Sequence, residues 1–60
     1  MTVGDLYEMV EELDSYAGSN FVTDWELNFI ADMFGIKLQG RSYSARQSEI
    51  IVDLHEKYCD

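Results

Sequence analysis

The sequence predicts an all-α fold of three helices within one domain that spans residues 1–60. Three observations support this prediction. Apolar residues recur at three- and four-residue spacing in three separate segments. A Ser or Thr precedes each segment, followed three residues later by Asp, Glu or Gln, as in a capping box. The chain contains no proline, and glycine-containing turns separate the segments. We expect helices over 3–17, 24–39 and 45–58, the last two forming an antiparallel hairpin.

The first expected helix, 3–17, begins at an approximate capping box formed by Thr2 and Asp5. Its apolar stripe follows helical spacing and comprises Val3, Leu6, Val10, Leu13 and Ala17. The opposite side carries Asp5, Glu8 and Glu12. Gly18 is placed to follow the last helical turn as the C′ residue.

The second expected helix, 24–39, begins at a capping box of Thr23 and Glu26. Its helical register continues through Gly35, so we expect Gly40 to be the C′ residue that ends it. One side is lined by Trp25, Phe29, Met33 and Ile36, and the other by Leu27, Ile30, Ala31, Phe34 and Leu38. A helix that is apolar on two sides must be buried on both. We therefore expect this helix to be the central element.

The third expected helix, 45–58, begins at a capping box of Ser44 and Gln47. Its core stripe consists of Ile50, Ile51, Leu54 and Tyr58. Asp53 and Lys57 lie four residues apart on the polar side, a spacing that favours an ion pair.

The charge is distributed unevenly along the chain. The net charge of −8 comes entirely from residues 1–36, which contain eight acids and no Lys or Arg. In the remaining 24 residues four acids balance four basic residues. An acidic surface repels nucleic acid and anionic membranes and attracts basic partners.

Length and cysteine content limit how the chain is stabilised and where it acts. A chain of 60 residues buries only about 60% of its unfolded surface, so a monomer is marginal and we expect a homo-oligomer. Cys59 is the only cysteine, which suits a reducing compartment. There is no cationic leader and no apolar run of about 18 residues, so we expect a cytoplasmic protein that does not enter membranes.

The residues capable of chemistry do not form a catalytic or metal-binding motif. His55 and Cys59 lie at i, i+4 spacing, which offers two metal ligands, half of a four-coordinate site. A thiolate near a helix C-terminus is not activated for nucleophilic attack. We therefore expect no enzymatic activity, no metal and no cofactor.

Part of the sequence resembles a known group of proteins. Short segments distributed over residues 22–58 are similar to those of small helical proteins and modules encoded by bacteriophages: Trp25-Glu26, Phe29-Ile30, Gly40-Arg41, Tyr43-Ser44 and Arg46-Gln47. This chain departs from that pattern in Gly35 and in the separate acidic helix before it. The resemblance implies no defined activity. It implies a phage origin and action in the host bacterial cytoplasm.

These observations lead us to expect a non-enzymatic module that binds a host or phage protein through an apolar patch framed by acids. The expected contact residues are Met9, Tyr16, Trp25, Phe29 and Met33, with Glu8 and Glu12. One alternative is an acidic DNA mimic that inhibits a nucleic-acid-binding protein. Another is a helix-turn-helix-like DNA-binding module, with Arg46 and Gln47 at the start of its recognition helix. The acids along the third helix make nucleic acid the less expected partner.

Overall fold

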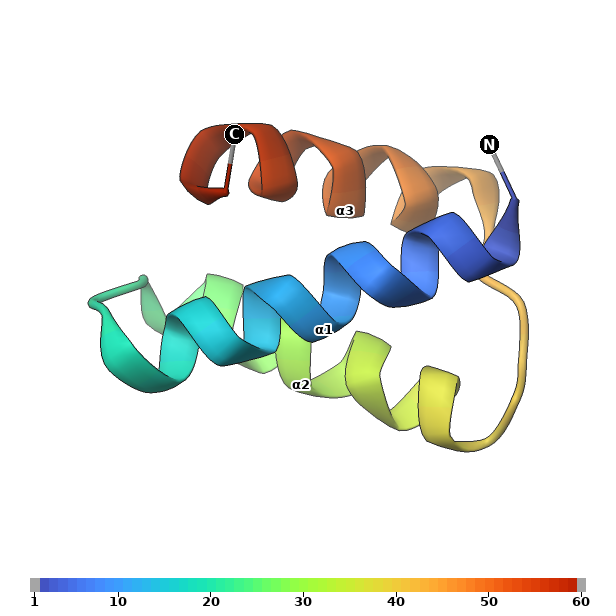
Figure 1. Cartoon of the computed structure of the whole chain (residues 1–60), viewed down its shortest axis with the longest axis horizontal. Coiled ribbons are helices and arrows are strands. Elements are labelled where there is room, and N and C mark those ends of the chain that lie inside the picture. The colour runs from blue at the N-terminus through green and yellow to red at the C-terminus, as the bar shows by residue number, and fades with distance from the viewer. Residues whose placement is uncertain (1, 60) are drawn as a thin grey trace.

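The computed structural model describes residues 2–59 and consists of three helices (Figure 1). Helix α1 spans Val3–Ser19, α2 spans Asp24–Leu38 and α3 spans Ala45–Tyr58. The predicted all-α, three-helix fold is confirmed, and the helix boundaries agree with the sequence to within two residues. In Figure 1, α2 and α3 run in opposite directions along the long axis, as expected for the hairpin.

Each helix begins at a complete capping box, as the sequence predicted. In every case the cap hydroxyl accepts a hydrogen bond from the backbone N–H of the third helical residue, and that residue's side chain accepts one from the cap N–H. The pairs are Thr2 with Asp5, Thr23 with Glu26, and Ser44 with Gln47. These local interactions satisfy backbone donors that a helix start otherwise leaves free.

The end of α2 is a Schellman motif centred on Gly40. Gly40 has a φ of 71°, in the left-handed region that favours glycine. Its N–H donates to the carbonyl of Lys37 at 3.0 Å, and the N–H of Arg41 donates to the carbonyl of Ile36 at 3.1 Å. Gly40 is therefore the C′ residue, and α2 continues through Gly35, as predicted.

The end of α1 differs from its prediction. Gly18 is not a C′ residue, because α1 continues to Ser19 and is capped by Asn20 in an extended conformation. The backbone N–H of Asn20 donates to the carbonyl of Tyr16 at 2.9 Å, and its side-chain amide donates to the same oxygen at 3.3 Å. These two bonds end the helix without a left-handed residue.

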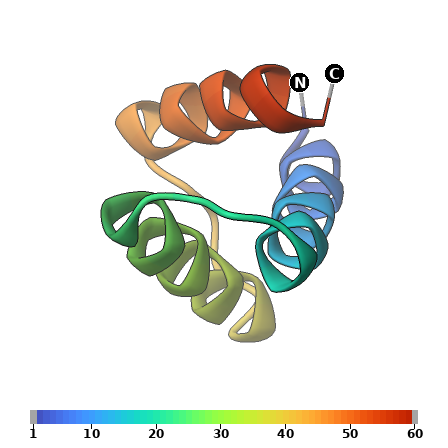
Figure 2. The same cartoon turned by 90° about the vertical axis from the view of Figure 1, so that its left-hand side faces the viewer.

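The central helix is α1, and the prediction that α2 is central is wrong. Helix α1 packs against both α2 and α3, whereas α2 and α3 make few contacts with each other. Figure 2 shows α2 and α3 diverging on one side of α1. The core consists of Leu6, Val10 and Leu13 from α1, Ile30 and Met33 from α2, and Ile51 and Leu54 from α3.

The connection between α2 and α3 is attached to α1 by two tyrosines. The hydroxyl of Tyr7 on α1 donates to the carbonyl of Arg41, and the Tyr7 ring meets the Tyr43 ring edge to face at 5.7 Å. The hydroxyl of Tyr43 donates to the carbonyl of Met33 at 2.8 Å. Burial, with a further contribution from Tyr7, raises the pKa of Tyr43. The connection is thus fixed to the first helix.

Two glycine substitutions provide a matched test of the α2 ending. Gly35→Ala is expected to stabilise the fold by up to about 1 kcal/mol, because Gly35 is helical and an added Cβ meets nothing within 4 Å. Gly40→Ala is expected to destabilise it by about 1 kcal/mol or more, because alanine is strained at a φ of 71°. Urea denaturation measures both. Shifts of the same sign would contradict the assigned ending.

Candidate interaction surface

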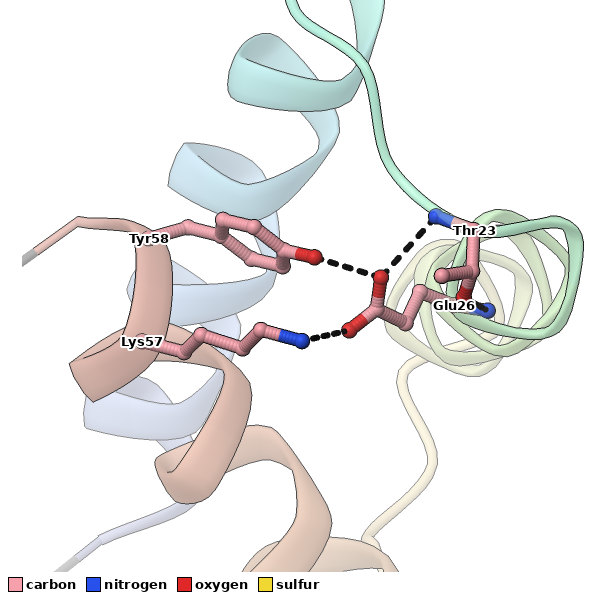
Figure 3. Close-up of polar contacts among 4 residues, drawn as sticks. All are labelled: Thr23, Glu26, Lys57 and Tyr58. Carbon is pink, nitrogen blue, oxygen red and sulfur yellow. Dashed lines mark hydrogen bonds and ion pairs between the residues drawn. The ribbon is translucent and has the colours of Figure 1, made fainter.

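A buried carboxylate lies where the start of α2 meets the end of α3 (Figure 3). Glu26 is only 5% exposed. Its Oε1 accepts hydrogen bonds from the backbone N–H of Thr23 at 2.9 Å and from the hydroxyl of Tyr58 at 2.5 Å. Its Oε2 accepts one from the Nζ of Lys57 at 2.8 Å. A residue predicted only to cap α2 therefore also joins α2 to α3.

These contacts favour the ionised form of Glu26. The hydrogen bonds from Lys57, Tyr58 and the Thr23 backbone lower the pKa of Glu26 from 4.5 to about 2, against the opposing effect of burial. The hydrogen bond to Glu26 raises the pKa of Lys57 and also that of Tyr58. Thr23, Lys57 and Tyr58 all donate to Glu26, so the arrangement holds the start of α2 against the end of α3.

His55 and Cys59 take part in the contact between α1 and α3. The Nε2 of His55 lies 3.2 Å from the Oε1 of Glu12 on α1. Burial, and then the nearby Glu12 carboxylate, raise the pKa of the Cys59 thiol, which disfavours a reactive thiolate. Within residues 2–59, no three His, Cys, Asp or Glu side chains are grouped to hold a metal ion.

The predicted contact residues on α1 mostly take part in packing. Met9 is half-buried against the core. Tyr16 stacks on Tyr58 of α3 with ring centroids 4.9 Å apart. Glu8 is exposed, whereas Glu12 faces His55. The structure therefore leaves Glu8 as the freest of these four side chains for a partner.

Of the three predicted contact residues on α2, one is buried in the core and the other two lie at or near the surface. Met33 is only 4% exposed and belongs to the core, so it does not form part of an outer patch. Trp25 is 59% exposed and stacks on the half-buried Phe29 with ring centroids 5.4 Å apart. The flank that the sequence assigned to a partner thus presents Trp25 outward, supported by Phe29.

A second apolar surface lies on the other flank of α2. Its residues follow i, i+4, i+7, i+11 spacing, and we name it the α2 stripe: Leu27, Ala31, Phe34 and Leu38. Leu27 is 48% exposed and Leu38 is 72% exposed. The sequence pattern contained this stripe, but the assumption that α2 is central assigned it to the interior. The stripe is exposed because α1, and not α2, is covered on both sides.

Of the two residues that suggested DNA binding, Gln47 takes part in the helix cap and Arg46 is exposed. The side chain of Gln47 accepts a hydrogen bond from the backbone N–H of Ser44 at 2.9 Å, so its oxygen is occupied by the helix cap. Arg46 is exposed beside it. A shallow depression on the outer face of α3 is lined partly by Glu49 and Asp53, which phosphates would avoid.

Together these residues define a small all-α domain whose buried charge is structural and which exposes apolar side chains on both flanks of α2. None of the helices within residues 2–59 is both long enough and apolar enough to cross a membrane. Comparison of the chain with family models, with curated proteins and with solved structures found no match.

Proposed function

We propose that this chain is a non-enzymatic protein-binding module that contacts its partner through α2. The observation that carries the proposal is the exposure of large apolar side chains on both flanks of one helix: Trp25, Leu27 and Leu38. Tryptophan is among the residues that carry most of the binding energy at protein interfaces, and an exposed apolar patch often marks an interaction site. The net charge of −8 favours a basic partner and speeds its approach. The phage resemblance would make that partner a phage or host-bacterial protein.

Affinity capture from bacterial lysate tests this function. The wild-type chain is expected to retain a partner that a Trp25→Ser/Leu27→Ser/Leu38→Ser variant fails to retain. Glu49→Gln, an exposed change on the outer face of α3, is the control and should behave as wild type. All variants must first show the helical circular dichroism of the wild type. Equal capture by the triple variant would contradict a role for α2.

Self-association is a second candidate, because a homo-oligomer would cover the same exposed residues of α2. Repulsion between chains that each carry −8 should oppose assembly at low ionic strength, so we expect the oligomer to strengthen as salt increases. Sedimentation at tens of micromolar across a salt series measures this. A mass that stays at 6.9 kDa throughout would contradict the homo-oligomer expected from the sequence.

A further inference from the structure

The α2 stripe is a straight apolar ridge beside α1. From Leu27 to Leu38 it extends for about 16 Å along the helix axis. The contacts of Lys37 indicate on which side of α2 the stripe lies. The Nζ of Lys37 is 5.5 Å from the centroid of the Phe34 ring and 2.8 Å from the Oε1 of Glu11 on α1. The stripe therefore lies on the flank of α2 that borders α1.

Acidic residues adjoin this ridge. Asp24 is exposed three residues before Leu27, one helical turn along α2. On α1, Asp14 is exposed three residues after Glu11, on the side that Lys37 contacts. Lys37 is the only basic residue in α1 and α2. Two exposed carboxylates, those of Asp14 and Asp24, thus lie beside the stripe.

The contacts of Lys37 indicate which chemical groups of a partner could bind at this surface. Its ammonium group is held between an aromatic face and a carboxylate, which combines a cation–π contact with an ion pair. A partner that brings further cations alongside apolar side chains would extend the same pattern to Asp14 and Asp24. A second copy of this chain brings acids to the same positions and is the poorer match.

We propose that the α2 stripe docks a basic amphipathic helix of the partner protein. Apolar residues of that helix, at i, i+4 and i+7 spacing, pack along Leu27, Ala31 and Leu38, as helices pack ridge against groove. Its Lys or Arg residues pair with Asp14 and Asp24. This inference rests on the proposed protein-binding function and specifies the surface and the chemistry of the partner.

Designed peptides test the inference without the natural partner. The probe is a capped helical peptide of Leu and Lys with Leu at i, i+4 and i+7 spacing. One matched peptide carries Glu in place of Lys, and a second has the same composition in scrambled order. We expect the probe to bind, with amide chemical-shift changes concentrated along α2 and the adjoining side of α1, and the two matched peptides to bind at least tenfold more weakly.

Variants of the protein then locate the contact. Leu27→Ser/Leu38→Ser should weaken probe binding about tenfold or more, and Asp14→Asn/Asp24→Asn should weaken it and reduce its salt dependence. Glu49→Gln/Asp53→Asn, a pair of exposed charge removals on α3, is the matched control that should bind as wild type. Circular dichroism must show each variant to be folded.

The outcomes separate this inference from the proposed function. The inference is overturned if binding survives Leu27→Ser/Leu38→Ser, or if the Glu peptide binds as strongly as the probe. If lysate capture depends on α2 while the probe does not bind, the protein-binding function stands and the basic helix does not. Self-association that buries the stripe would identify a second copy as its occupant and also overturns the inference.

Discussion

Glu26→Gln is expected to destabilise the fold by about 3 kcal/mol at neutral pH. The pKa of Glu26 falls from 4.5 in the unfolded chain to about 2 in the folded protein, and one pH unit corresponds to 1.36 kcal/mol. Gln resembles the protonated carboxyl group, because it keeps the shape and loses the charge that pairs with Lys57. At neutral pH the variant therefore lacks the stabilisation that the wild type loses when Glu26 is protonated.

The sign of the pH dependence follows from the lowered pKa. Ionised Glu26 contributes its full stabilisation above about pH 4.5, and this is lost as the pH falls from there through about 2. Urea denaturation across that range should show the wild type losing stability steeply and Glu26→Gln much less. Glu49→Gln, an exposed change of the same type, is the control and should keep the wild-type slope. Parallel curves for wild type and Glu26→Gln would contradict the role assigned to this carboxylate.

The sequence predicted the interactions that are local along the chain. Capping boxes at Thr2, Thr23 and Ser44 involve residues three positions apart, so their residue types and spacing were sufficient to place the helix starts. The second role of Glu26 was not predictable in this way, because Lys57 and Tyr58 lie 31 and 32 residues further along the chain. Only the packing of α3 brings them to the start of α2.

Burial around α2 was only partly predictable for a related reason. Periodicity shows which residues share a side of a helix, but not which side a neighbouring helix covers. Met33 and Trp25 were assigned to the same flank, yet Met33 is 4% exposed and Trp25 is 59% exposed. The exposed Leu27 and Leu38 were visible in the pattern and were assigned to the interior because α2 was expected to be central.

Leu13→Ala is expected to destabilise the fold by about 2–5 kcal/mol, the range for truncating a buried leucine. Leu13 lies in the middle of the α1 face that packs against the other two helices and is 1% exposed. Removing its side chain leaves a cavity in the shared core and weakens the contacts of α1 with its neighbours. A 60-residue domain has roughly 3–9 kcal/mol of stability in total, so the variant should lose a large share of it and melt at a clearly lower temperature.

The matched change Leu27→Ala distinguishes the two possible central helices. Leu27 is 48% exposed on α2, so the same truncation there creates no enclosed cavity and should cost less than about 1 kcal/mol. Thermal denaturation followed by circular dichroism compares the two variants directly. If α2 were the helix buried on both sides, Leu27→Ala would cost as much as Leu13→Ala. A large difference between them places α1 at the centre and leaves the α2 stripe free for a partner, because a residue cannot both support the core of the isolated chain and be available at its surface.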